Sequence, residues 1–296
     1  MNKVCKLISE VNEGNYICGT GFFVSSNGYI VTSAHNVSNC KKTNVFYKNM
    51  CIDSKVLCED RRLDIALLKI DDIETDGCML AEPTGYCKCY TYGYPKDLFC
   101  INYQEGVVNS INYAVGSTID AMISSFVSRK GTSGSPIFSQ DGSVIGIVNW
   151  YSEAVGSGGT IFSLVIPRIY AMVKTHETPE RGYLSLQTDI LSIQDIIHNH
   201  FMKGKKIIKG VLVTGSKVPQ IKKSDIIFGV NNHAVGGAYQ SVESRLYTSQ
   251  VGSMVELSVL TRESNYMKPK KINVVVERYP SHLDKPIHDQ YFSNIL

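Results

Sequence analysis

The sequence predicts a mostly-β fold in two parts, with an all-β barrel or sandwich through about Ile166 and a smaller domain after it. Two observations predict the first part: β-prone apolar runs are short and closely spaced, and glycine and asparagine separate them with almost no helical periodicity. A third observation favours two domains, because the chain has 296 residues and is 43% hydrophobic.

The charge balance and the cysteine pattern name no partner or metal. Basic residues number 30 and acidic residues 27, which gives a net charge of +3. This is far from the strong positive field typical of nucleic-acid binding, so we expect no nucleic-acid partner. The 9 cysteines lie in the first hundred residues without repeated Cys-x-x-Cys pairs. We therefore expect free thiols and no metal site.

The N-terminal segment and the rest of the chain lack long apolar stretches. Residues 1–10 do not build the uninterrupted apolar run of a secretory signal, and no segment approaches the roughly 18 apolar residues that span a bilayer. From these observations we expect a soluble protein with no signal peptide and no membrane span. The cysteines are then expected to be reduced, in a cytoplasm-type compartment.

Two strands joined by a tight turn are predicted between Gly19 and His35. Apolar β-prone residues lie on both sides of Asn27-Gly28, and this pair supplies the positive φ angles of a two-residue hairpin turn. His35 follows the second strand directly. The residue pattern alone leaves two roles open for it, an ordinary histidine at a strand end or a proton acceptor.

A carboxylate opens the next apolar run, which extends from Asp64 to Ile70. A carboxylate in that place is at least partly desolvated, so it needs a charged or hydrogen-bonding partner. Two kinds of partner are open. One is a salt bridge to the neighbouring Arg61 or Arg62, and the other is the Nδ1–H of His35.

Further strands are predicted at residues 89–95, 105–111 and 118–124, ahead of a short stretch around Ser133. Ser133 lies between two glycines in Gly131–Pro136, and an apolar run follows at residues 145–150. Such a stretch is typical of an ordinary turn, but it also suits a nucleophilic serine beside backbone N–H groups. A helix is predicted at residues 167–174, where proline lies in the first turn.

The motifs taken together resemble the HtrA (DegP-like) branch of the trypsin-like serine proteases. The segments that carry the resemblance are 19–22, 32–37, 63–69, 131–136 with 144–147, and 164–167. His35, Asp64 and Ser133 also occur in the chain order of the chymotrypsin template. The resemblance implies a chymotrypsin-like double β-barrel followed by a smaller PDZ-like α/β domain.

The resemblance also implies a domain plan, because segments at 181–186, 210–214, 223–231 and 252–259 look like a PDZ domain. The plan is an N-terminal arm (1–18), a trypsin-like serine protease domain (19–175), a linker (176–181), a PDZ-like domain (182–279) and a C-terminal tail (280–296). The PDZ domain would bind a peptide as an added strand. The backbone N–H groups of Tyr183, Leu184, Ser185 and Leu186 would receive its terminal carboxylate.

The activity implied by the resemblance is that of a serine endopeptidase without metal or organic cofactor. Ser133 would attack the peptide carbonyl, His35 would take its proton, and Asp64 would orient the imidazole. The oxyanion hole would consist of the N–H groups of Gly131 and Ser133.

The substrate pocket implied by the resemblance has Val127 at its base, six residues before Ser133. One wall would follow Asn149, Trp150 and Tyr151. Because an apolar base offers no counter-charge, we expect cleavage after small or medium aliphatic residues.

A second class of function stays open at this stage. The chain could be a catalytically idle scaffold or chaperone that binds peptides with the same fold, although a scaffold has no need to keep all three residues of a triad. Expected partners are protein or peptide substrates, a PDZ peptide ligand and further copies of the chain. Arg129 and Lys130, next to the serine, are either exposed loop residues or a device that steers acidic substrate segments.

Overall fold

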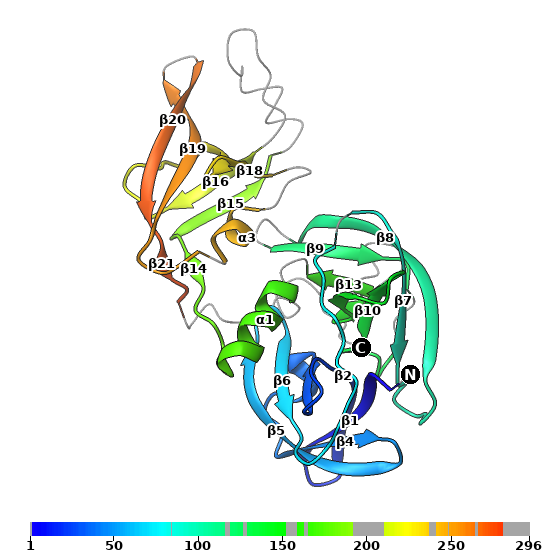
Figure 1. Ribbon diagram of the computed structural model, residues 1–296. Coiled ribbons are helices and arrows are strands. Elements are labelled where there is room, and N and C mark those ends of the chain that lie inside the picture. The colour runs from blue at the N-terminus through cyan, green and yellow to red at the C-terminus, as the bar shows by residue number, and fades with distance from the viewer. Residues whose placement is uncertain are drawn as a thin grey trace. The chain divides into compact units, whose positions relative to one another are not determined.

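The computed structural model describes residues 2–83, 85–115, 119–126, 129–151, 159–162, 165–191, 210–236, 241–247, 249–263 and 266–280. The chain forms two compact units. The first is drawn mainly from Met1–Ile111 and Ala121–Pro179, and the second mainly from Glu180–Leu283. Both are rich in β-strands (Figure 1), which confirms the mostly-β prediction.

The first unit begins with a closed six-stranded barrel, drawn in blue to cyan in Figure 1. Its strands are β1 (Val4–Asn12), β2 (Asn15–Phe23), β3 (Tyr29–Thr32), β4 (Lys42–Tyr47), β5 (Met50–Asp60) and β6 (Ile65–Lys69). They pair in the order β1-β2-β3-β6-β5-β4. Apolar side chains from every strand meet inside, among them Leu7, Phe23, Ile30, Val45 and Leu68. Burial of this interior drives closure of the barrel.

Residues 1–18, expected as an N-terminal arm, instead contribute to the barrel. β1 pairs with β2 along one side and with β4 along the other. Residues 15–18 extend β2 towards its N-terminal end. The arm assignment is therefore corrected, because without β1 the edges of β2 and β4 would be left unpaired and the barrel could not close.

The predicted hairpin is present, but its turn is longer than two residues. β2 ends at Phe23 and β3 begins at Tyr29. Within the loop of residues 24–28, only Gly28 has a positive φ, +84°. A Cβ atom on Gly28 would lie 2.3 Å from the Ile70 carbonyl oxygen, so a close backbone approach as well as the φ angle requires glycine here.

The second half of the first unit is a seven-stranded sheet in the order β11-β10-β7-β8-β9-β13-β12. Its strands are β7 (Lys88–Gly93), β8 (Asn102–Val115), β9 (Ile119–Ser124), β10 (Pro136–Ser139), β11 (Val144–Ile147), β12 (Trp150–Tyr151) and β13 (Gly159–Phe162). Within the described residues, no pairing joins β11 to β12, so the sheet is open there. Its core holds Val108, Met122, Phe126, Ile137 and Ile145.

Helix α1 (Val165–Thr175) packs on the first unit and begins two residues before the predicted helix. A buried ion pair fixes it, because Arg168 Nε lies 2.6 Å from Asp60 Oδ2 and both side chains are at most 5% exposed. Arg168 also donates to the Pro179 carbonyl, and the Thr178 hydroxyl donates to the Glu59 carbonyl. The end of the first unit is thereby tied to strand β5.

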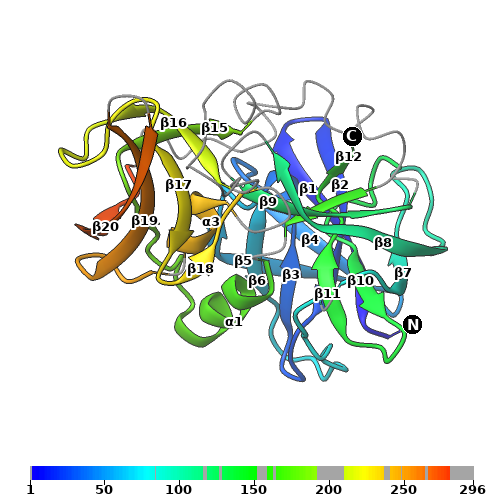
Figure 2. The same cartoon turned by 90° about the horizontal axis from the view of Figure 1, so that it is seen from above.

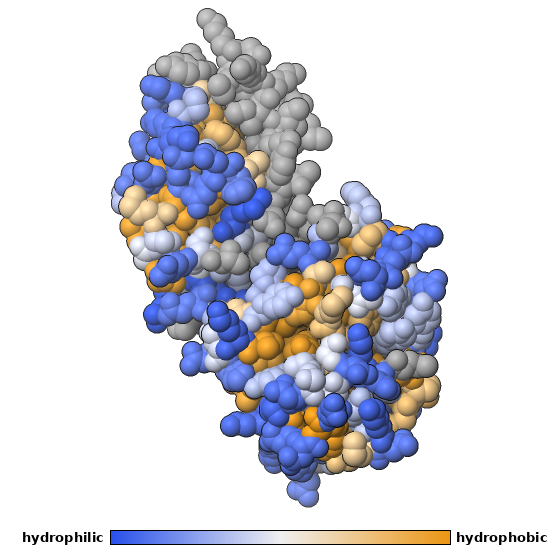
Figure 3. All heavy atoms as spheres, viewed as in Figure 1, coloured by the Kyte–Doolittle hydropathy of each residue, from blue (hydrophilic) through white to orange (hydrophobic). Residues whose placement is uncertain are grey.

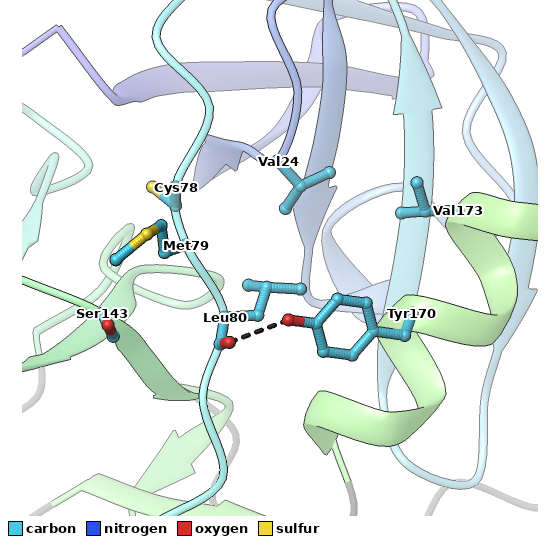
Figure 4. A pocket seen from close by; sticks show the side chains of 7 residues that line it. All are labelled: Val24, Cys78, Met79, Leu80, Ser143, Tyr170 and Val173. Atoms are coloured by element: carbon cyan, nitrogen blue, oxygen red, sulfur yellow. Dashed lines mark hydrogen bonds between the residues drawn. The ribbon is translucent and has the colours of Figure 1, made fainter.

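A cleft of about 300 Å³ borders α1 on the first unit (Figure 4). Its lining is mostly apolar and consists of Val24, Cys78, Met79, Leu80, Ser143, Tyr170 and Val173. The Tyr170 hydroxyl donates to the Leu80 carbonyl at 2.8 Å. The spheres of the first unit also show hydrophobic side chains gathered between hydrophilic rims (Figure 3). None of the site residues expected from the sequence lines this cleft.

The second unit is a small α/β domain (Figure 2). Its elements are β14 (Gly182–Tyr183), β15 (Leu186–Ile190), β16 (Val211–Ser216), β17 (Ile226–Val230), β18 (His233–Ala234), α3 (Val242–Tyr247), β19 (Met254–Glu263), β20 (Tyr266–Val275) and β21 (Glu277–Arg278). The main sheet has the order β15-β16-β17-β19-β20, and β14 pairs with β21. Val213, Val235, Leu246 and Leu257 lie in its core.

Candidate active site

His35 and Asp64 form a two-point contact where strand β3 ends and strand β6 begins. His35 lies in a 3₁₀ turn, Ala34–Asn36, just after β3. Its Nδ1 lies 2.7 Å from Asp64 Oδ2, and its backbone N–H donates to Asp64 Oδ1 at 2.8 Å. Because an ionised carboxylate only accepts hydrogen bonds, Nδ1 carries the proton and leaves Nε2 as the basic nitrogen. The carboxylate thus holds both the tautomer and the ring of His35.

The turn before β6 presents Asp64 in an unusual backbone conformation, with φ of +55°. The Leu63 N–H donates to Asp60 Oδ1 at 3.1 Å, which fixes this turn from within. Asp64 is 2% exposed. Of the two alternatives for its partner, His35 is the one observed, since Arg61 Nε lies 3.2 Å from Glu59 instead.

Asn149 lies behind the carboxylate and not in a substrate pocket. Its Nδ2 donates to the Asp64 carbonyl at 2.7 Å and lies 3.3 Å from Asp64 Oδ2. The side chain is fully buried. The expectation that Asn149 lines the pocket wall is therefore corrected: the amide turns inward, because a buried aspartate needs donors on more than one side.

The surroundings raise the pKa of His35 above its ordinary value. Burial is the largest single effect and disfavours the imidazolium, but the charge of Asp64 and its hydrogen bond together outweigh burial. The His35 side chain is 16% exposed. A raised pKa makes His35 a stronger base for a neighbouring hydroxyl.

Ser133 lies in a loop whose carbonyl groups are anchored by strand β2 and the 3₁₀ turn. The Thr20 N–H and the Asn36 side-chain amide both donate to the Ser133 carbonyl, each at 2.9 Å. The Thr20 hydroxyl donates to the Gly131 carbonyl at 2.9 Å. Asn36 follows His35 in the chain, so the same turn carries the histidine and binds the serine loop. Ser133 is 2% exposed, more enclosed than the turn-like sequence suggests.

The glycines on either side of Ser133 are required by close approaches as well as by their positive φ angles. Gly131 has φ of +91°, and a Cβ atom there would lie 2.4 Å from the Lys96 nitrogen. Gly134 has φ of +87°, and its Cβ would lie 2.1 Å from the Thr20 carbonyl oxygen. The loop therefore packs backbone against backbone, which only glycine permits.

Two backbone N–H groups beside Ser133 have no acceptor within the described part of the chain, those of Gly131 and Ser133 itself. The Lys130 carbonyl accepts the Lys96 N–H at 2.8 Å. In a trans peptide the C=O and N–H point in opposite directions, so this bond turns the Gly131 N–H away from Lys96. Paired free donors of this kind suit an oxyanion.

The remaining pocket residues are only partly described. Val127, the expected base, lies outside the described residues. Trp150 and Tyr151 form β12 and pair with β13, but their side chains are not described. Arg129 and Lys130 are exposed, as expected of loop residues. In the described ranges, no group of three or more His, Cys, Asp or Glu side chains is placed to hold a metal ion.

In the second unit, the expected carboxylate-binding stretch connects β14 to β15. Tyr183 pairs with Glu277 in β21, and the Ser185 hydroxyl donates to Glu277 Oε2 at 2.9 Å. The Leu186 N–H donates to the Leu184 carbonyl at 2.6 Å, so this donor is already engaged. The inclusion of Leu186 among the carboxylate-binding donors is corrected accordingly. β15 is an edge strand of its sheet within the described residues.

The sequence pattern does not single out the two side chains that hold the serine loop, Thr20 and Asn36. Neither belongs to a motif that names its role. The glycine at position 19, next to Thr20, is one indirect signal in the sequence that a side chain packs there. A Cβ atom on Gly19 would lie 2.4 Å from the Asn36 side chain, so this glycine makes room for the amide that binds Ser133.

The barrel, the anchored serine loop and the His35–Asp64 contact define the class as a trypsin-like peptidase fold. A model of the trypsin-like peptidase domain matches residues 19–147. The chain is 24% identical over 294 residues to a probable periplasmic serine endoprotease, DegP-like, of Rhizobium meliloti, covering 90% of this chain and 55% of the relative. A DegP-like relative of Rickettsia prowazekii is 26% identical, with 86% and 52% covered. The chain is thus similar to HtrA-type serine proteases, and its first unit has the trypsin-like fold.

The fold similarity extends to solved structures. The structure of the HtrA-type protease AlgW with a tripeptide superposes with a TM-score of 0.73 and 17% identity, covering 94% of each chain. The serine endoprotease from Yersinia pestis gives a TM-score of 0.66 and 16% identity, covering 94% of this chain and 95% of the other. These matches confirm the expected trypsin-like β-barrel fold.

The curated relatives also correct one expectation. The chain spans about half the length of the DegP-like relatives it matches. Those relatives are named periplasmic, which contradicts the expected cytoplasm-type compartment. The expectation rested only on the absence of a long apolar run in residues 1–10. Among the described helices, none has the length and apolar character to cross a membrane.

Proposed function

We propose that the chain is a serine endopeptidase in which Ser133, His35 and Asp64 act together. Ser133 Oγ attacks the substrate carbonyl as its proton passes to His35 Nε2. Asp64 stabilises the resulting imidazolium through Nδ1–H and does not itself take up the proton. His35 then protonates the leaving amine, and water hydrolyses the acyl-enzyme with the same base.

The backbone N–H groups of Gly131 and Ser133 serve as the oxyanion hole of this reaction. Each such donor is worth about 3 to 4 kcal/mol of transition-state stabilisation in comparable sites. The donors are set before substrate arrives, because the carbonyls that share their peptide units are bound: the Lys130 carbonyl accepts the Lys96 N–H, and the Thr132 carbonyl accepts the Ser135 N–H at 3.1 Å. Preorganised donors cost no rearrangement at the moment of reaction.

The observation that carries the proposal is the 2.7 Å contact of His35 with Asp64 in the same turn whose Asn36 binds the Ser133 carbonyl. The names of the DegP-like relatives support the same activity. A fluorophosphonate added to the purified chain should form one adduct, on Ser133, located by mass spectrometry of its peptides. A chain that stays unmodified under conditions where trypsin is fully labelled would overturn the proposal.

Cleavage after small or medium aliphatic residues is the specificity that we propose, on the sequence-based expectation that Val127 is the base of the pocket. An apolar base leaves a lysine or arginine side chain without a counter-charge, which costs several kcal/mol on burial. A peptide library digested by the chain and sequenced by mass spectrometry measures the preference. As a second test, Val127→Asp should supply the missing counter-charge and shift cleavage towards Lys and Arg. A wild-type preference for those basic residues would contradict the expectation.

The second unit is proposed to act as a PDZ-type peptide-binding domain, with the ligand adding a strand to the edge of β15. The N–H groups of Leu184 and Ser185 have no acceptor among the described residues and could receive a terminal carboxylate. We expect a peptide with a free C-terminus to bind more tightly than its C-terminal amide in fluorescence anisotropy. Equal affinity for the two forms would show that the carboxylate is not recognised.

A further inference from the structure

A buried lysine in the first barrel strand faces a turn of the second half of the unit. Lys6 is the third residue of β1 and is 2% exposed. Its Nζ donates to the carbonyl oxygens of Pro95 at 3.3 Å, Lys96 at 3.0 Å and Leu98 at 2.7 Å. Among the described residues no carboxylate pairs with it.

Three carbonyl groups match the three donors of an ammonium group. The Phe99 ring covers the same group, with Nζ 4.3 Å from the ring centroid. A buried ammonium is costly unless its donors are met, so this site favours one geometry of the 95–98 turn over others. The lysine therefore fixes the turn more firmly than an apolar residue of the same length could.

The 95–98 turn in turn orients the serine loop. The Lys96 N–H donates to the Lys130 carbonyl at 2.8 Å, the bond that directs the Gly131 N–H. At the start of the turn, the Tyr94 N–H donates to the Thr20 hydroxyl at 2.9 Å, and that hydroxyl donates to the Gly131 carbonyl. Lys6 is the cross-strand neighbour of Thr20 in the β1–β2 register. The Lys130 carbonyl is thus linked to Lys6 of β1 through the 95–98 turn. The Gly131 carbonyl is bound directly by Thr20 of β2.

We propose that Lys6 is a positioning residue that keeps the oxyanion hole open by holding the 95–98 turn against the Lys130 carbonyl. This inference rests on the proposed peptidase function. Without the Lys6 ammonium, the turn loses three hydrogen bonds and the Lys96 N–H no longer holds a fixed place. The Lys130–Gly131 peptide is then free to rotate, which points its carbonyl and not its N–H at the oxyanion.

The test compares Lys6→Met, which keeps the length and removes the donors, with Lys6→Arg, which restores donors. Removing an oxyanion donor lowers kcat by about 10²–10³-fold. The Lys130–Gly131 peptide should rotate only part of the time, so the Gly131 N–H is lost as a donor in only a fraction of the molecules. We therefore expect Lys6→Met to lower kcat by about 10- to 100-fold, with KM changed less than about twofold. Lys6→Arg should recover most of kcat. The acid limb of the pH profile should stay in place, because the His35–Asp64 contact is untouched.

The matched control is Leu7→Ala, the next residue of β1, which is fully buried in the barrel core. It weakens the fold without touching the turn, so its kcat well below its melting temperature should equal that of the wild type. Should Lys6→Met fail to fold, Lys6→Gln retains two donors and should give an intermediate loss of kcat. A folded Lys6→Met or Lys6→Gln with wild-type kcat would overturn the inference while leaving the peptidase function intact. A wild-type chain without peptidase activity would overturn both.

Discussion

Replacing Ser133 with alanine is expected to lower kcat by about 10⁶-fold and to abolish labelling by a fluorophosphonate. Loss of the nucleophile removes the acyl-enzyme route, and what remains comes from substrate binding and the oxyanion donors. Because Ser133 is held through its backbone carbonyl by Thr20 and Asn36, the alanine variant keeps those anchors. Its fold and melting temperature should therefore stay close to those of the wild type.

Ser135→Ala is the matched control for this prediction. Ser135 is a buried serine two residues further along, and its hydroxyl donates to the Thr132 carbonyl at 2.6 Å. Its removal costs about 1 kcal/mol of stability and should leave Ser133 open to labelling. Peptidase activity that survives in Ser133→Ala, in a preparation free of other proteases, would contradict the assignment. An idle scaffold predicts that neither variant differs from an inactive wild type.

Asp64→Asn is expected to lower kcat by about 10⁴-fold while leaving the fold intact. An asparagine amide in this place no longer selects the tautomer with the proton on Nδ1, so His35 Nε2 stops acting as a base. The imidazolium formed during the reaction also loses its carboxylate partner, 2.7 Å away. Steady-state hydrolysis of a peptide substrate gives kcat directly. Asp71→Asn, a change at an exposed carboxylate, should have no effect.

The wild type and Asp64→Asn should also differ in the pH dependence of kcat/KM. The pKa of His35 is raised above its ordinary value of 6.5. Since only neutral His35 accepts the serine proton, wild-type kcat/KM should fall as pH drops through an apparent pKa above 6.5. Without the Asp64 charge, burial dominates and lowers the pKa, so the limb of Asp64→Asn should move to lower pH. An unchanged limb would show that a group other than His35 controls it.

Much of the first unit could be predicted from local sequence. The strand runs and the proline at the start of α1 each act within a few residues, and their positions agree with the structure. The predicted hairpin turn failed because the backbone at Gly28 is shaped by Ile70, which is distant in the chain. The arm assignment failed for a similar reason, since β1 is held by pairing with β4.

The sequence alone determined the mostly-β class, the two-unit division and the three residues His35, Asp64 and Ser133 as candidates, because spacing and residue type suffice for these. Only the tertiary structure decided how they are held. Asn149 donates to Asp64, Thr20 binds the serine loop, and Lys6 binds the turn that faces it. Each of these contacts joins residues at least 85 positions apart, so no local pattern encodes it. Their partners are chiefly backbone carbonyls, which every residue carries and no sequence motif can mark.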